Sequence, residues 1–301
     1  MLHIEKYAAI DIGSNAIRLL IATVIEKEGF PTQFKKTSLV RLPIRLGADV
    51  FLKGSVCSDN YKRLLDAMMA YSLIIKTHKV VAFRACATSA MREAKNGQQI
   101  VSRLKAATGI EIQIIDGNDE AAIIASTDLK QLISDNKVFL YVDVGGGSTE
   151  FTLFANGHTI ASQSFKLGTV RIINGMVDDA TWQQAKNWVT QHTKAYSKID
   201  VIGSGGNINS IYRFSEKKVG KPLSYLFMSS FYQKIKQYDY HQRVFDLKMN
   251  PDRADVIIPA TRIYLSAMKW AQAKNIYVPK IGLADGIVKQ LYNERNAAGL
   301  K

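Results

Sequence analysis

Tyr141-Val142-Asp143-Val144-Gly145-Gly146-Gly147-Ser148-Thr149-Glu150 is the stretch of sequence that decides the fold. Apolar residues precede it and follow it, so the pattern predicts a β-hairpin whose tip is three glycines. Glycine accepts positive φ and lets a ligand approach the backbone closely. Successive glycine N–H groups can form a concave set of donors for phosphate oxygens.

Hydroxyl and carboxylate side chains surround this predicted turn. Ser148 and Thr149 add hydroxyl donors, and Asp143 and Glu150 bracket the glycines. A phosphate site tolerates two such carboxylates only if a cation lies between them. The alternative is an ordinary glycine hairpin with solvated acids. Short glycine motifs match by chance, so this stretch alone leaves both interpretations open.

A second copy of the pattern lies near the N-terminus, in residues 7–24. An apolar strand leads to Asp11, a Gly13-Ser14-Asn15 turn follows, and a second apolar strand begins after it. An internal repeat is more informative than either motif alone. We therefore expect two hairpins that face each other across a cleft and hold phosphates and a metal from both sides.

These two loops resemble the phosphate-1 and phosphate-2 loops of the actin-like ATPase superfamily. Within it, the chain is most similar to the exopolyphosphatase / guanosine pentaphosphate phosphohydrolase (Ppx/GppA) family, which three further stretches support: 87–94, 117–122 and 203–207. The resemblance implies an α/β fold of two ribonuclease-H-like domains with an interdomain cleft. It places the first domain at residues 1–124 plus a C-terminal helix, 287–301, and the second at 125–286.

The resemblance also implies roles for individual residues. Glu120, followed by Ala121, matches the general base of the family, and Asp119 beside it is the alternative base. Asp143 and Glu150 are the other catalytic carboxylates. With Asp11 they would hold Mg²⁺, directly or through water, because Mg²⁺ prefers carboxylates and keeps several waters.

The implied phosphate-binding set consists of loop glycines, their polar neighbours and two arginines. Guanidinium groups match phosphate oxygens, although Arg92 could instead pair with Glu93 and Arg18 could be a packed or solvated residue. The Gly205-Gly206 turn corresponds to the adenosine-contacting loop of the superfamily and could contact a nucleotide or distal phosphates. The complete set is Gly13, Ser14, Asn15, Arg18, Arg92, Gly145, Gly146, Gly147, Ser148, Gly205 and Gly206.

The expected activity is Mg²⁺-dependent hydrolysis of the terminal phosphoanhydride of inorganic polyphosphate, guanosine pentaphosphate or both. A polyphosphate or nucleotide sensor without turnover and a small-molecule kinase are the alternatives. Residues 186–301 contain 19 Lys+Arg against 8 Asp+Glu, a net charge of +11 out of +14 for the chain. A basic half indicates a polyanionic partner and favours polyphosphate, whereas nucleic acid is not favoured because no recognised binding motif is present.

Composition sets the remaining expectations. The 301 residues suggest two domains, and 47% hydrophobic with 22% charged residues is typical of a soluble globular protein. No run approaches the ~18 apolar residues of a membrane span, and the N-terminus lacks a signal-peptide layout. Cys57 and Cys86 are interpreted as reduced thiols in a cytoplasmic protein, and a homodimer is an open option.

Periodicity adds several helices and segments of open role. Helices are predicted over 61–76 with Asp59 as cap, over 119–132, and over 182–196 with Thr181 as cap. Three basic segments are harder to interpret. Arg41–Gly47 is predicted as an edge segment, Lys166–Arg171 as either a strand-to-helix turn or a functional family stretch, and Ser215–Asp246 as a packed helical insertion rather than a base-stacking surface.

Overall fold

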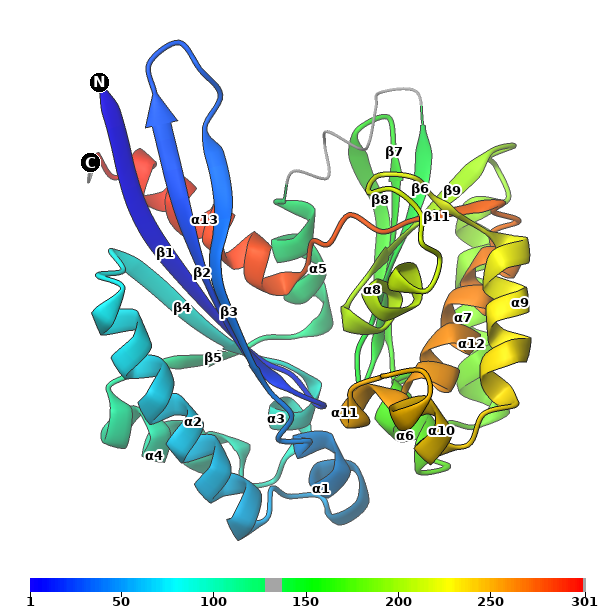
Figure 1. Ribbon diagram of the computed structural model, residues 1–301, viewed down its shortest axis with the longest axis horizontal. Helices are drawn as coiled ribbons and strands as arrows, with labels where there is room; N and C mark the ends of the chain where they lie inside the picture. Colours follow the sequence, from blue (N-terminus) through cyan, green and yellow to red (C-terminus); the bar gives the residue numbers. More distant parts are fainter. Residues whose placement is uncertain (128–136, 300–301) are drawn as a thin grey trace. The chain divides into compact units, whose positions relative to one another are not determined.

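The computed structural model describes residues 1–127 and 137–299, and the chain divides into two compact units (Figure 1). Unit 1 comprises Met1–Thr127 and Leu283–Lys301, and unit 2 comprises Asp128–Gly282. The sequence prediction placed the boundaries three and four residues away, after 124 and 286. Gly286 shows why its segment belongs to unit 1, since a Cβ there would lie 2.2 Å from the carbonyl oxygen of Ile123.

Unit 1 is a five-stranded mixed sheet in the order β3-β2-β1-β4-β5. Its strands are β1 (Leu2–Ile12), β2 (Ile17–Lys27), β3 (Gln33–Leu42), β4 (Ala82–Ala87) and β5 (Ile112–Ile114). Its helices are α1 (Leu46–Lys53), α2 (Ser58–Thr77), α3 (Ser89–Glu93), α4 (Gly97–Thr108), α5 (Gly117–Ala125) and α13 (Leu283–Ala297). The buried second half of β1 forms the centre of the core, with α2 and α4 on one face of the sheet and α13 on the other (Figure 1).

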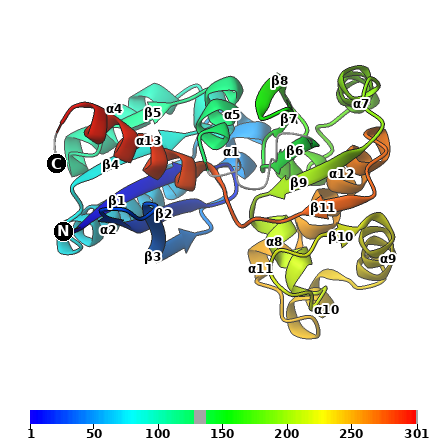
Figure 2. The same cartoon turned by 90° about the horizontal axis from the view of Figure 1, so that it is seen from above.

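Unit 2 is a six-stranded mixed sheet in the order β10-β11-β9-β6-β7-β8. Its strands are β6 (Val138–Val144), β7 (Thr149–Ala155), β8 (His158–Phe165), β9 (Ile199–Ser204), β10 (Leu223–Ser224) and β11 (Asn275–Tyr277). Its helices are α6 (Thr169–Ile173), α7 (Asp179–Thr193), α8 (Gly206–Arg213), α9 (Tyr225–Lys236), α10 (Tyr240–Phe245), α11 (Pro251–Ala254) and α12 (Ile257–Trp270). Helix α12 lies between α7 and α9, as both views show (Figures 1 and 2), and its apolar residues join the core beneath β6 and β9.

The predicted internal repeat is confirmed by the sheet order. In unit 1 the β1–β2 hairpin is extended by antiparallel β3 on one side and parallel β4 on the other. In unit 2 the β6–β7 hairpin is extended by antiparallel β8 and parallel β9 in the same arrangement. Each glycine turn therefore occupies the equivalent place, at the end of the central hairpin of its sheet.

Two predicted helix caps are wrong. Helix α2 is capped by Cys57, whose Sγ accepts the N–H of Asn60, rather than by Asp59. Helix α7 is capped by Asp178, whose Oδ1 accepts both the N–H and the hydroxyl of Thr181. In each case the residue that accepts from the first-turn N–H lies upstream of the predicted one.

The prediction of an edge segment over Arg41–Gly47 holds only for Arg41 and Leu42, which end the edge strand β3. The strand ends at Leu42, Pro43 cannot donate to a ladder, and Arg45 adopts φ 64°, so the chain turns into α1 rather than continuing along the edge. Helix α5 ends at Ala125, and the predicted continuation to Leu132 extends outside the described residues.

Within the segment 215–246 the helical prediction holds for α9, whereas α10 buries no residue and Phe245 is 85% exposed. Phe231 and Ile235 of α9 are buried, while Lys234 and Lys236 are exposed. The described helices include none that combines the length and the apolar character needed to cross a bilayer.

Candidate functional site

The glycine turn of unit 2 is closed by a hydrogen bond from the N–H of Gly145 to the carbonyl of Ser148, at 2.9 Å. Gly145, Gly146 and Gly147 are all absent from the residues with positive φ. A left-handed backbone is therefore not what requires glycine at these positions. A Cβ on Gly145 would lie 3.1 Å from the carbonyl oxygen of Ser148 within the turn itself, and the segment that begins α6 packs against the backbone of Gly146 and Gly147.

The carbonyls of this turn are all anchored from one side by the start of α6. The N–H of Thr169 donates to the carbonyl of Gly145 at 3.1 Å, and the N–H of Val170 donates to that of Gly146 at 2.9 Å. Arg171 Nε donates to the carbonyl of Gly147 at 2.7 Å. In a planar trans peptide the C=O and the N–H point in opposite directions, so the next three N–H groups point away from α6. Gly146, Gly147 and Ser148 thus present consecutive donors, which is the arrangement of an anion nest.

Gly168 makes this anchoring geometrically feasible. A Cβ at this position would lie 2.2 Å from the carbonyl oxygen of Gly146 and 2.3 Å from the carbonyl carbon of Gly147. Both are backbone atoms, so a side chain here would displace the turn itself. Lys166–Arg171 joins β8 to α6, as the strand-to-helix interpretation predicts, and the contact at Gly168 shows that the segment also packs on the glycine turn.

A row of polar side chains crosses the sheet beside the turn. Asp143 of β6 lies opposite Glu150 of β7, and Glu150 lies opposite Ser164 of β8. Side chains at directly opposed positions share one face of the sheet. Ser148 Oγ and Ser164 Oγ donate to Glu150 Oε1 at 2.7 and 2.8 Å. Glu150 is 2% exposed, whereas Asp143 is partly exposed, so a fixed and a more accessible carboxylate lie side by side.

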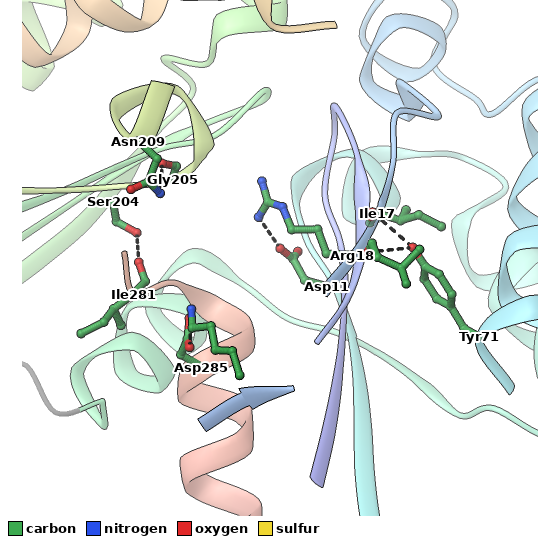
Figure 3. Close-up of polar contacts among 11 residues, drawn as sticks. Asp11, Ile17, Arg18, Tyr71, Ser204, Gly205, Asn209, Ile281 and Asp285 are labelled. Atoms are coloured by element: carbon green, nitrogen blue, oxygen red, sulfur yellow. Dashed lines mark hydrogen bonds and ion pairs between the residues drawn. The ribbon is translucent and has the colours of Figure 1, made fainter. Parts of the chain in front are cut away.

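The turn that begins α8 adjoins Asp143. Gly205 has φ 98°, and a Cβ on it would lie 3.1 Å from Asp143 Oδ1. Asn209 Nδ2 donates back to the carbonyl of Gly205 at 3.0 Å (Figure 3). Tyr264 donates to the carbonyl of Ser204, and burial, followed by the charge of Asp143, raises the pKa of Tyr264 well above its ordinary value. The predicted Gly205-Gly206 loop is therefore close to Asp143 within this unit.

Arg253 is a site residue that the sequence analysis did not assign. It is 8% exposed, and its Nη1 lies 3.1 Å from Asn207 Oδ1 at the start of α8. A Cβ on Gly206 would lie 2.0 Å from Arg253 Nη2, so glycine leaves the space that the guanidinium fills. The two partners are 46 residues apart, and no local pattern links them.

The turn of unit 1 is closed in the same way, by the N–H of Gly13 donating to the carbonyl of Ala16 at 3.2 Å. The Ser14 and Ser89 hydroxyls are 2.9 Å apart, and the carbonyl of Ser14 accepts the N–H of Gly47 at 2.7 Å. Helices α1 and α3 thus hold this turn, just as α6 holds the other.

Asp11, one of the predicted metal ligands, carries a cationic partner. Arg18 Nη1 donates to Asp11 Oδ2 at 2.7 Å across the β1–β2 pair (Figure 3). Burial raises the pKa of the Asp11 carboxyl, and the Arg18 guanidinium partly offsets this rise. Asp11 is 5% exposed, so its predicted metal-binding role and the predicted phosphate-binding role of Arg18 are linked by this ion pair.

The predicted base lies in the first turn of α5. Asp116 caps this helix by accepting the N–H groups of Asn118 and Asp119, both at 2.8 Å. The Asp119 carboxylate completes the capping box by accepting the N–H of Asp116 at 3.4 Å. Glu120 follows and is partly buried. Arg92 Nη1 donates to the carbonyl of Ile115 at 2.6 Å, which places this predicted phosphate clamp at the entry to the same helix.

Within residues 1–127 and 137–299, no group of three or more His, Cys, Asp or Glu side chains has the arrangement of a metal centre. Unit 2 by itself contributes the paired Asp143 and Glu150. Magnesium binding therefore stays a prediction.

Two sheets of matching order, each with a glycine turn on its central hairpin, define the two-domain actin-like ATPase fold. A crystal structure of an exopolyphosphatase from Cytophaga hutchinsonii shares this fold, with a TM-score of 0.82, 22% identity and coverage of 97% of this chain and 98% of that one. At this identity the likeness shows the fold alone.

The family follows from the sequence comparison. The sequence model of the Ppx/GppA phosphatase family matches residues 24–294, so this chain belongs to that family. It is 33% identical over 246 residues to a bifunctional 3-dehydroquinate synthase/phosphatase of Fusobacterium nucleatum, covering 71% of this chain and 36% of that protein. It is 31% identical over 177 residues to exopolyphosphatase 2 of Mycobacterium tuberculosis, covering 56% and 54%. The chain thus spans about half, or less, of the length of these curated relatives.

Proposed function

We propose that this protein hydrolyses the terminal phosphoanhydride of inorganic polyphosphate, guanosine pentaphosphate or both, with Mg²⁺ as cofactor. The observation that carries the proposal is the anchored turn of unit 2, whose consecutive N–H donors lie beside two carboxylates. Family membership and the similarity to a mycobacterial exopolyphosphatase support it.

Binding of the phosphates is assigned mainly to backbone donors. The N–H groups of Gly146, Gly147 and Ser148 match the several oxygens of a phosphoryl group. The turn at Gly13–Asn15 is assigned the same role in unit 1, with Arg18 and Arg92 as charged donors. The net charge of +11 over residues 186–301 favours a long polyanion, whose affinity grows with the number of cations along its path.

Asp143 and Glu150 fit Mg²⁺ as hard oxygen ligands. They are directly opposed on β6 and β7, and an ion that keeps several waters needs only one or two carboxylates from the protein. Asp11 fits less directly because Arg18 already neutralises it, so contact through water suits it better. When bound, Mg²⁺ would supply positive charge to the phosphate oxygens.

Glu120 is assigned as the base that orients the water and accepts its proton. The carboxylate of the competing candidate, Asp119, accepts the N–H of Asp116 in the capping box of α5. A general base needs an oxygen within reach of the water, and Glu120 has the longer of the two side chains.

The test is phosphate release from inorganic polyphosphate and guanosine pentaphosphate, side by side, with Mg²⁺ and at two salt concentrations. Glu120→Gln should lose about 10²–10⁴-fold in kcat while still binding substrate, and Asp119→Asn, the matched control, should stay within about tenfold. Full activity in Glu120→Gln would refute the assignment of the base. Binding without any phosphate release by the metal-replete wild type would favour a sensor. ATP consumption that depends on an added acceptor would favour a kinase.

A further inference from the structure

One of the three anchors of the unit 2 glycine turn comes from a side chain. The carbonyls of Gly145 and Gly146 are held by backbone N–H groups, but the carbonyl of Gly147 is held by Arg171. We infer that Arg171 is a positioning residue, whose guanidinium fixes the Gly147–Ser148 peptide so that the Ser148 N–H faces the phosphate. The inference rests on the proposed function and adds to it the residue that keeps the donor set intact.

The contact is short, charged and shielded from water. Arg171 Nε lies 2.7 Å from the Gly147 carbonyl oxygen, and the arginine is only 6% exposed. A hydrogen bond from an ionised donor is roughly twice as strong as a neutral one. Shielding of the partners from water strengthens it further. Arg171 therefore holds this peptide more firmly than a solvated side chain would.

This particular peptide needs such an anchor. Rotation of the Gly147–Ser148 peptide plane changes ψ of Gly147, where the lack of a Cβ offers little steric resistance, and φ of Ser148. Rotation would turn the Gly147 carbonyl toward the bound anion and take the Ser148 N–H away from it, because the two groups point in opposite directions. An acceptor would then replace a donor, which repels a phosphate oxygen. The Ser148 hydroxyl, which donates to Glu150 Oε1 at 2.7 Å, would be displaced as well.

The fold itself has other supports at this point. The N–H groups of Thr169 and Val170 keep α6 attached to the turn whatever side chain follows them. Gly168 packs directly on the same backbone. Loss of the Arg171 side chain therefore releases one peptide without detaching α6. We expect the consequence to fall on phosphate binding and turnover, with the fold retained.

The experiment compares the wild type, Arg171→Met and Arg171→Lys in steady-state hydrolysis of inorganic polyphosphate, with circular dichroism to follow the fold. Arg171→Met should remain folded and lose about 100-fold in kcat/KM, which is the loss typical of a group displaced by about 1 Å from its productive position. Arg171→Lys keeps a charged donor and should lose less. Val189→Ala, which empties space at a fully buried position of α7 and removes none of the three anchoring hydrogen bonds, is the control for stability and should keep its kcat/KM.

Chemical rescue separates positioning from general damage. Millimolar guanidinium should restore part of the activity of Arg171→Ala, because the ion can occupy the vacated space, and should do nothing for Val189→Ala. Wild-type kcat/KM in Arg171→Met, an unfolded Arg171→Met, or a loss that the Val189→Ala control shares would each overturn the inference. Absence of phosphate release by the wild type would instead refute the proposed function, so the two failures are distinguishable.

Discussion

Gly168→Ala should damage the glycine turn of unit 2 more than it damages the fold. The new Cβ would lie 2.2 Å from the carbonyl oxygen of Gly146, whereas ordinary contact begins at 3.4 Å. The turn or α6 must therefore shift by about 1 Å. Overpacking of this kind costs about 1–3 kcal/mol, and a 1 Å misplacement near the chemistry costs about 10²-fold in rate. At about 2–4 °C per kcal/mol, the melting temperature of unit 2 should fall by roughly 2–12 °C.

The assay is kcat/KM for polyphosphate beside a calorimetric or circular-dichroism melt. Gly175→Ala is the matched control, because Gly175 has φ +67° and open space around it, so alanine there brings about 1–2 kcal/mol of backbone strain without touching the turn. We expect similar losses of melting temperature in the two variants and a loss of activity only in Gly168→Ala. Equal activities, or a parallel loss in Gly175→Ala, would refute the reasoning.

Three further predictions concern other parts of the molecule. Burial opposes ionisation of Glu5, but the hydrogen bond from Tyr7 and the charge of Arg295 outweigh it and lower the pKa of Glu5. The ionised Glu5 therefore stabilises the fold above the unfolded pKa near 4.5, and this stabilisation is lost as pH falls through the lower folded pKa. Urea denaturation should show that Glu5→Gln costs about 1–3 kcal/mol at pH 7 and nothing near pH 2. Burial raises the pKa of Cys86 to about 12, so only Cys57 should react with a thiol reagent at pH 8 in the native protein, and rapid modification of both thiols would contradict this. Gly206→Ala displaces the Arg253 guanidinium, so the effects of Gly206→Ala and Arg253→Met on kcat/KM should be non-additive by at least about threefold, and simple additivity would show that the contact is not made.

The central hairpins could be predicted because their signals are local. Strand, aspartate, glycine turn and strand follow one another in both halves, and the sheet order confirms that the two copies are equivalent. The residues around the turns were less accessible to prediction. Arg171 and Gly147 are 24 residues apart. Arg253 lies in the short helix α11, where the sequence predicts only a helix-capping role.

Local detail failed where two residues compete for one role. Asp59 is a good capping residue, yet Cys57 accepts the first-turn N–H of α2 because the chain enters the helix two residues earlier. Helix α1 was not predicted because the chain enters it through Arg45, which adopts a left-handed conformation that is uncommon for arginine. The choice between Asp119 and Glu120 as the base stays a prediction, to which the coordinates add that the Asp119 carboxylate accepts the N–H of Asp116 in the capping box.

The most direct test of the central claim is whether the N–H groups of Gly146 and Gly147 bind phosphate. Selective ¹⁵N-glycine labelling of the Glu120→Gln variant would let their amide resonances be followed during titration with Mg²⁺ and a short polyphosphate. The account predicts downfield amide-proton shifts at these two glycines that saturate with the same Kd as binding measured by calorimetry, while Gly29, in an exposed turn with no role in the site, stays unchanged. Saturated binding that leaves the Gly146 and Gly147 resonances where they were would contradict it.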